Sequence, residues 1–455
     1  MKLISQFKNK YNNITYNTYQ LKNGMKVLHL DNPATVNFDF ALIHKAGSAY
    51  ETEECVPNGT AHFLEHMLLN PNDTFKTKDQ INRFEQGGID RPNIFINAFT
   101  NRKYIVFSGN GHEDGKKRIL ERLGSIYQFP KRKFGNQMEK ERGIILAEKS
   151  RKLKKENDNY LMSLEFLFKG IQDEFTGDVL GEIEDIKNIS VDDLEGYFKS
   201  KITFNNTVIS IQSNGVLDKK TEKILEDISE KLPKREVKED RDIKLENRYR
   251  VGSFTDKREN GVSVAFIYFR KDISKIDYNL RLKEYLFIKL LDWLSFEILR
   301  EKKSLIYGFS PFKNLNNSFE YILYGYKFTT EKEKVEETIE EFYRLMYEYT
   351  FRFLKTKKGK EWFEDALSTY IYPKTAVYDN TLAEGVATTV VENKEIFNYN
   401  KAVREAKKIK IGDIKDFLNM QLDILPHIWI EGNINKKEVS DIIKSSSFEK
   451  RFNTV

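Results

Sequence analysis

The chain has 455 residues, of which 40% are hydrophobic and 13% aromatic, so it can bury the cores of at least two domains. Lysine and arginine exceed aspartate and glutamate by only six, 75 against 69, which argues against a nucleic acid or a membrane as partner. One cysteine, Cys55, excludes an internal disulfide and cysteine-rich zinc modules, and without an apolar leader or a membrane-length apolar run we expect a soluble, cytoplasmic protein.

Strand and helix patterns alternate along the first half. Residues 20–45 predict two strands joined by a turn at Asn23-Gly24, because apolar residues alternate there. Residues 59–70, GTAHFLEHMLLN, carry the apolar stripe of a helix, with Thr60 as the expected N-cap. The other predictions, in chain order, are a helix at 76–88, a strand at 93–110, a long helix at 135–170, a helix at 190–201 capped by Ser190, and a strand at 206–215.

Residues 230–248 are mostly charged and contain a proline, which predicts a linker. After it the pattern restarts, and its last helix and strand echo the pair that ends the first half. We therefore expect an α+β fold of two homologous halves, 1–229 and 249–455, each a mainly antiparallel sheet flanked by helices. The elements predicted in the second half are strands at 261–272, 320–328 and 427–434 and helices at 278–303, 335–355 and 410–420.

A pair of histidines stands out in the segment HFLEH. His62 and His66 lie four residues apart, and Glu65 lies between them. On a helix all three side chains project from one arc of about 100°. Two imidazoles at this spacing can hold one zinc ion, and the glutamate can then take a proton from an attacking water and pass it to a leaving amine. The alternative is a surface or core-edge helix whose histidines make ordinary hydrogen bonds.

A zinc site on this helix needs a third protein ligand. No other histidine lies in an obvious place, so a carboxylate is expected to complete the set. The helical segment MEKERGIILAEKSRK offers Glu139, Glu141 and Glu148. Glu141 and Glu148 are seven residues apart and share a face, where one could bind the metal while the other supports the site. In isolation, such glutamates are more often simply solvated.

The segment HFLEH resembles the inverted H-x-x-E-H signature of the inverzincins. The segment ERGIILAE, some 75 residues downstream, resembles the third-ligand helix of the same proteins. The family is that of pitrilysin, insulin-degrading enzyme and the mitochondrial processing peptidase. The resemblance implies a catalytic first half in which His62, His66 and Glu148 are the zinc ligands, Glu65 is the general base and Glu141 supports the site.

Two further segments extend the resemblance. GGIDRPNIFINAFT is similar to the family's glycine pair and Asn-Ala-x-Thr strand, which implies that Asn97 and Ala98 lie on an edge strand that pairs with the substrate backbone; on spacing alone a plain buried strand is favoured. LREKKSLIYG is similar to the family's Arg and Tyr pair, which implies that Arg300 and Tyr307 contact substrate and that Tyr307 helps to stabilise the oxyanion. Without the family, Arg300 would be a favourable helix C-terminal charge and Tyr307 a half-buried aromatic.

No histidine occurs between His112 and His427, so the second half cannot repeat the site and we expect one zinc ion per chain. His29, His44 and His112 carry no motif and are expected to be structural or surface residues.

The first functional hypothesis is a zinc endopeptidase acting on peptides or extended unfolded segments, for general turnover or for processing a precursor or leader peptide. The family resemblance implies a chamber of four such domains, and hence a homodimer or a heterodimer with a related chain, in which Arg300 and Tyr307 could serve the partner's site. The second hypothesis is a non-catalytic partner subunit that binds peptides or scaffolds a heterodimeric peptidase. The third is an α/β binding protein whose histidines have no catalytic role.

Overall fold

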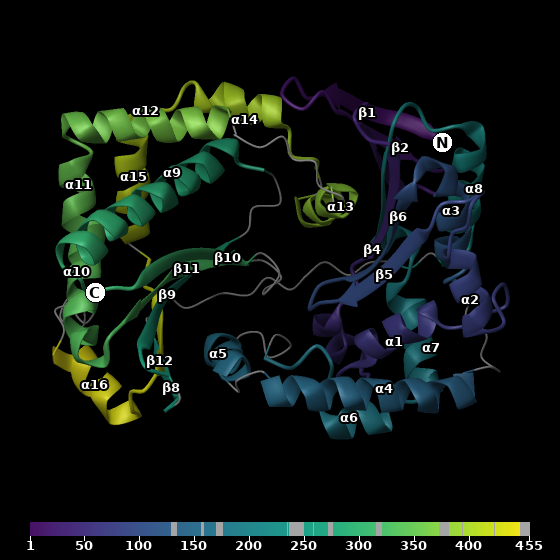
Figure 1. The fold of residues 1–455 in the computed structure, drawn as a ribbon, viewed down its shortest axis with the longest axis horizontal. Coiled ribbons are helices and arrows are strands. Elements are labelled where there is room, and N and C mark those ends of the chain that lie inside the picture. Colours follow the sequence, from purple (N-terminus) through teal and green to yellow (C-terminus); the bar gives the residue numbers. More distant parts are fainter. Residues whose placement is uncertain are drawn as a thin grey trace.

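The computed structural model has two halves, each built on one β-sheet (Figure 1). It describes the whole chain except residues 129–133, 156–158, 170–175, 234, 236–249, 258, 272–275, 315–320, 373–381, 394, 423 and 446–455. The strands of the first half are β1 (Lys2–Lys8), β2 (Thr15–Gln20), β3 (Lys26–Asp31), β4 (Asn37–His44), β5 (Ile94–Thr100), β6 (Ile105–His112) and β7 (Thr207–Ser213). Those of the second half are β8 (Val251–Thr255), β9 (Val262–Lys271), β10 (Gly308–Asn314), β11 (Tyr321–Thr330) and β12 (His427–Gly432).

Helices flank both sheets. The first half contributes α1 (Thr60–Leu69), α2 (Lys78–Glu85), α3 (Lys116–Gly124), α4 (Phe134–Lys155), α5 (Asn159–Phe168), α6 (Ile183–Asn188), α7 (Val191–Lys201) and α8 (Lys219–Glu230). The second half contributes α9 (Tyr278–Leu294), α10 (Val335–Arg344), α11 (Thr350–Phe353), α12 (Lys357–Ile371), α13 (Leu382–Asn393), α14 (Tyr399–Ala406), α15 (Ile411–Leu422) and α16 (Lys436–Ser445). None of the described helices is both long and apolar enough to cross a membrane.

Each sheet contains five strands in the same arrangement. The strand order is β1-β2-β3-β7-β4-β6-β5 in the first sheet and β10-β11-β9-β12-β8 in the second. Among the described strands, the one parallel pair of each sheet joins the first of these five strands in the chain to the last, β3 with β7 and β8 with β12. The first sheet continues beyond β3 with β2 and β1, whereas no described strand lies beyond β8. This arrangement confirms the predicted fold class, two similar halves with mainly antiparallel sheets.

Each half sends one helix onto the sheet of the other half. Helix α13, from the second half, packs Ala387 and Val390 against Ile43 and Val106 of the first sheet. Helix α5, from the first half, belongs to the apolar cluster of the second sheet that contains Trp429. Figure 1 shows both helices in the space between the two sheets. The halves are therefore joined by two small apolar clusters as well as by the chain.

Most predicted elements are present, with some differences. The predicted long helix at 135–170 is two helices, α4 and α5, and the strand predicted at 93–110 is two strands around a tight turn in which Asn101 Oδ1 accepts the N–H groups of Lys103 and Tyr104. Thr60 does not cap α1, so that prediction is wrong; Ser190 does cap α7, in a capping box with Asp193. The predicted linker at 230–248 lies outside the described residues except for 230–233 and 235, and the domain division there stays a prediction.

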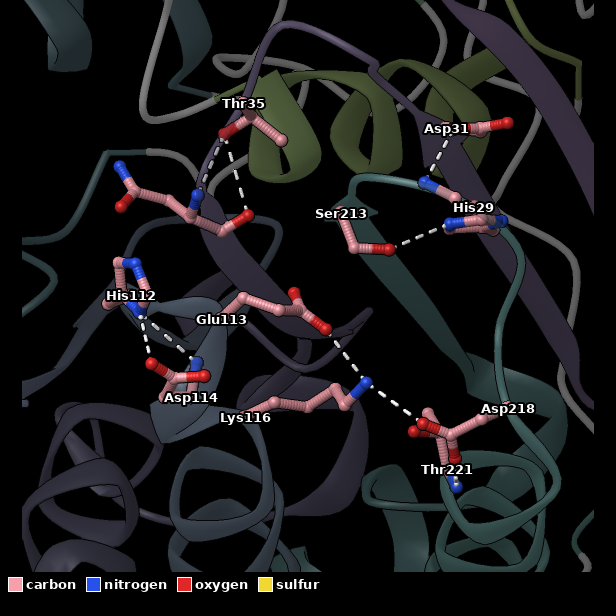
Figure 2. A network of polar contacts seen from close by, with 12 residues as sticks. His29, Asp31, Thr35, His112, Glu113, Asp114, Lys116, Ser213, Asp218 and Thr221 are labelled. Carbon is pink, nitrogen blue, oxygen red and sulfur yellow. Dashed lines mark hydrogen bonds and ion pairs between the residues drawn. The ribbon is translucent and has the colours of Figure 1, made fainter. Parts of the chain in front are cut away.

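The histidines outside the motif are structural or surface residues, as expected. His29 is buried, with its Nε2 atom 3.0 Å from Ser213 Oγ, and His112 lies on the surface beside Asp114 (Figure 2). His44 is fully buried between Thr207 and Tyr127. Because Thr207 Oγ1 donates its proton to the carbonyl of Thr203, His44 Nδ1 must donate to Thr207, and Nε2 accepts from Tyr127. His44 is therefore a neutral imidazole with both nitrogens satisfied.

Burial lowers the pKa of His44 to about 3, so the unfolded chain binds a proton at this residue more readily than the folded chain. We expect its contribution to stability to be complete above about pH 6.5 and to fall by about 1.4 kcal/mol per pH unit below it. In His44→Gln, the free energy of unfolding measured in urea should therefore fall less steeply between pH 6.5 and pH 5 than in the wild type. Equal slopes for the two proteins would contradict this account of His44.

Candidate metal centre

Helix α1 is fixed by its apolar side and by an unusual cap. Phe63, Leu64 and Met67 are buried in the core of the first half. The N-cap residue is Gly59, whose φ of 92° suits glycine and which offers no side chain to the helix. Glu51 replaces that missing cap, because its two carboxyl oxygens accept the Gly59 N–H at 3.0 Å and the Ala61 N–H at 2.7 Å. These contacts set the position of the first turn, which carries His62.

His62, His66 and Glu148 come together although they lie on different helices. Glu148 extends from α4, and its Oε2 lies 3.9 Å from His62 Nε2 and 3.7 Å from His66 Nε2. One potential ligand atom from each residue lies within 4.8 Å of the others. Two imidazole nitrogens and one carboxylate oxygen are a donor set that zinc hydrolases use, so the residues present fit a zinc ion. Glu139, also considered from the sequence, is instead paired with Arg142 on the surface of α4.

Glu141 lies behind His66. Its Oε2 is 3.3 Å from His66 Nδ1, and its Oε1 accepts a hydrogen bond of 3.0 Å from Lys78 Nζ. Burial alone would raise the pKa of Glu141, but the hydrogen bonds from His66 and Lys78 lower it to about 2. An ionised Glu141 holds the proton of His66 on Nδ1 and leaves Nε2, which faces Glu148, free to bind a cation.

Glu65 is buried on the same helix. Its Oε2 accepts a hydrogen bond of 2.9 Å from Thr100 Oγ1, at the end of β5. Burial raises the pKa of Glu65, opposed by His66 and by the Thr100 hydrogen bond. A carboxyl group with a raised pKa, held beside two imidazoles, is suited to accept and release a proton.

Three residues of this environment were not assigned roles from the sequence: Glu51, Lys78 and Thr100. Thr100 lies within the Asn-Ala-x-Thr motif, so the motif could have indicated it. Glu51 and Lys78 have no helical spacing to the histidines, and only the folded chain brings them close. In the sequence, the indication of Glu51 is that it is the one charged residue of the segment AGSAYE.

The other predicted residues lie on two different halves. Asn97 and Ala98 are on β5, which forms the outer edge of the first sheet and ends beside Glu65. Arg300 and Tyr307 are exposed on the second half, where Tyr307 donates a hydrogen bond of 2.8 Å to Glu331 that raises the pKa of the phenol. No contact among the described residues joins Arg300 or Tyr307 to the histidines of the same chain.

Comparison with protein families gives two matches along this chain. Residues 26–166 match the family described as insulinase (peptidase family M16), and residues 188–350 match the peptidase M16 inactive domain. The first match contains His62, Glu65, His66 and Glu148, and the second contains none of them.

Curated relatives resemble the first part of the chain. The mitochondrial-processing peptidase subunit beta of Neurospora crassa is 27% identical over 216 residues, which cover 48% of this chain and 43% of that protein. The corresponding subunit of Rattus norvegicus is 32% identical over 182 residues, which cover 39% of this chain and 34% of that protein. The alignments thus span less than half the length of either relative.

Solved structures resemble the whole fold. Pitrilysin superimposes with a TM-score of 0.74 at 17% identity, covering 99% of this chain and 50% of its own. The first half of the periplasmic protease PqqL from Escherichia coli gives 0.73 at 16% identity, covering 98% of both chains. A peptidase M16 inactive domain from Pseudomonas fluorescens gives 0.72 at 18% identity, covering 92% of this chain and 98% of its own. At these identities the likeness concerns the fold alone.

The different positions of Glu148 and Glu141 predict different effects on bound metal. Glu148→Gln removes a charged donor that faces both imidazoles, so we expect zinc measured by elemental analysis of the purified protein to fall at least tenfold after dialysis against a weak chelator. Glu141→Gln should retain most of the zinc and bind it about ten- to a hundredfold more weakly in a chelator titration. Equal zinc loss in the two variants would contradict these roles.

Proposed function

We propose that this chain, which belongs to the M16 peptidase family, is a zinc-dependent endopeptidase that cleaves peptides or extended, unfolded segments. The observation that carries the proposal is the convergence of His62, His66 and Glu148 around one point, beside the buried carboxyl group of Glu65. Glu148 lies 82 positions after His66 and 86 after His62, so the fold and not local spacing brings these donors together, and this supports a cation site.

Each of these residues has a different role in the proposed peptide hydrolysis. A zinc ion held by His62, His66 and Glu148 would supply a Lewis acid for the scissile carbonyl. Glu65 takes a proton from the attacking water and delivers it to the leaving amine, for which its raised pKa and its fixed hydrogen bond to Thr100 suit it. Glu141 keeps the ring of His66 in one orientation.

Substrate binding is assigned to the edge of the first sheet. Among the described strands, β5 pairs with β6 alone, and its last residue, Thr100, forms the hydrogen bond to Glu65. An extended peptide that pairs with Asn97 and Ala98 would place its backbone beside Glu65. Such pairing requires an unfolded substrate segment, because the peptide backbone must be free to form ladder hydrogen bonds.

A second chain completes the site in this proposal. Arg300 and Tyr307 lie on the half that does not carry the histidines, and they have no described contact with them. The fold of this chain corresponds to half of pitrilysin, so two chains, identical or related, would supply a chamber of four domains. The alternative of a non-catalytic subunit is not favoured, because the match to the inactive domain covers 188–350 and leaves all four site residues outside it.

Glu65→Gln tests the base. The amide cannot accept the proton, so peptide cleavage should fall by at least about a thousandfold while zinc content stays unchanged. Cleavage would be measured with a quenched fluorescent peptide and zinc by elemental analysis of the same sample. Thr100→Val is the matched variant that retains the carboxylate and loses only its hydrogen bond, and it should lose much less activity. Cleavage by Glu65→Gln at the wild-type rate would exclude Glu65 as the base.

A mixing experiment tests the partner. Tyr307→Phe and Glu65→Gln chains should each be weakly active alone, because each lacks one group of the site. If Tyr307 serves the other chain, a mixed dimer has one complete site, and random mixing should restore about a quarter of the wild-type activity. If Tyr307 serves its own chain, mixing restores none. Sedimentation of the mixture shows whether mixed dimers form, so the two outcomes can be separated.

A further inference from the structure

In the part of the chain that the structure describes, no strand covers the β8 edge of the second sheet. In the first sheet the corresponding strand, β3, is covered by β2, which pairs with it antiparallel from Thr15 to Gln20. The five core strands are otherwise arranged alike in both sheets, so the place that β2 takes in the first half has no described strand in the second. An uncovered sheet edge offers a row of backbone donors and acceptors to an incoming strand.

The backbone of β8 shows which groups face this edge. The Ile428 N–H donates to the Arg250 carbonyl at 2.8 Å, and the Asp256 N–H donates to the Gly432 carbonyl at 2.9 Å, so these two ends of β8 face β12. In a parallel pair, the residues of a strand alternate between its two neighbours. The N–H and C=O groups of Val251 and Ser253 therefore face away from β12, toward the open side.

A groove of about 680 Å³ lies along that side, between α5 and α16. Gly252 faces Phe166 of α5 and Trp429 of β12, and Val439 and Ile443 of α16 are the apolar residues on the other side. In the first half the counterpart of this space is filled, because Ile14 and Tyr16 pack there with Leu30 and with Val386 of α13. The groove therefore offers apolar side chains of α5 and α16 to a strand that would lie along β8.

The rim of the groove is positively charged. Its charged lining residues are one carboxylate, Glu165, and four cations, and Lys169 is paired with that carboxylate. Arg250 lies over the ring of Phe166, 5.3 Å from its centroid, and Lys436 and Lys444 are exposed on α16. None of these last three cations forms an ion pair with a residue that the structure describes, so the groove is complementary to a partner that carries negative charge.

We propose that the β8 edge binds an extended peptide segment whose apolar side chains alternate with acidic ones, added to the second sheet as an antiparallel strand in the place that β2 takes in the first. The backbone of the segment would pair with Val251 and Ser253, its apolar side chains would fill the groove, and its carboxylates would meet Arg250, Lys436 and Lys444. This site is separate from the edge strand β5 and the histidines of the first half, and it does not depend on the proposed peptidase activity.

The test uses the full chain carrying Glu65→Gln, so that no peptide is consumed. The probe is a fluorescein-labelled peptide of ten residues in which leucine and valine alternate with glutamate and aspartate, and its binding is followed by anisotropy with and without EDTA. We expect saturable binding that EDTA leaves unchanged. In Lys436→Glu/Lys444→Glu the Kd should rise at least about tenfold, whereas Lys437→Glu, a matched reversal on the same helix outside the groove, should change it less than about twofold.

Hydrogen exchange locates the bound peptide. Binding should slow exchange in the segment that contains Val251 and Ser253, and a peptide with lysine in place of its acidic residues should not. Protection of residues 94–100 alone would overturn the proposal while leaving the proposed peptidase site intact. Equal binding by the groove and control variants would also overturn it. A fall in sedimenting mass caused by Lys436→Glu/Lys444→Glu, without peptide binding to either protein, would assign the edge to a second copy of the chain instead.

Discussion

The site depends on how the beginning of α1 is held. Glu51 is fully buried and accepts two backbone N–H groups of the first turn, which has no capping side chain of its own. Burial raises the pKa of Glu51 to about 8, opposed by these two hydrogen bonds, so the structure places a carboxyl group there at a cost in solvation. As a result, α1 is held at its N-terminus by Glu51 and along its apolar side by the core of the first half. Both sets of contacts hold the part of α1 that carries His62.

The surroundings of the two imidazoles are dominated by carboxyl groups. Glu65 and Glu141 are buried and Glu148 is partly exposed, and among the described residues Lys78 forms an ion pair with Glu141. The effects of this crowding differ. Glu141 has a low pKa because hydrogen bonds from His66, Lys78 and Asn70 outweigh its burial. Glu65 has a raised pKa because burial outweighs its single hydrogen bond and its neighbour His66. A bound cation would relieve the repulsion among these groups. The same carboxyl groups would therefore favour binding of a cation.

The parts of this site that follow helical spacing could be predicted from the sequence. His62, Glu65 and His66 lie on one side of a helix, and Glu141 and Glu148 lie on one side of another. The helical repeat is therefore enough to predict each of these two groups from the sequence. The meeting of the two helices, the contact of Lys78 with Glu141 and the cap from Glu51 depend on packing across distant segments, which spacing does not encode. Similarly, β8 is short and β10 contains Pro311, so neither has a clear strand pattern, although both belong to the second sheet. The prediction of one helix at 135–170 failed because its apolar residues continue past the end of α4 into α5, which packs on the other sheet.

The crossing of α5 and α13 between the two halves limits how the polypeptide can be divided. If either half were produced alone, the sheet face that the missing helix covers would be exposed to solvent. The apolar side of its own crossing helix would also be exposed, because the sheet that it packs on would be absent. If the backbone is cleaved between the halves, the two fragments should consequently stay associated through the contacts of α5 and α13. The two halves together are therefore the smallest unit of this fold that can be fused to another protein, duplicated or exchanged intact.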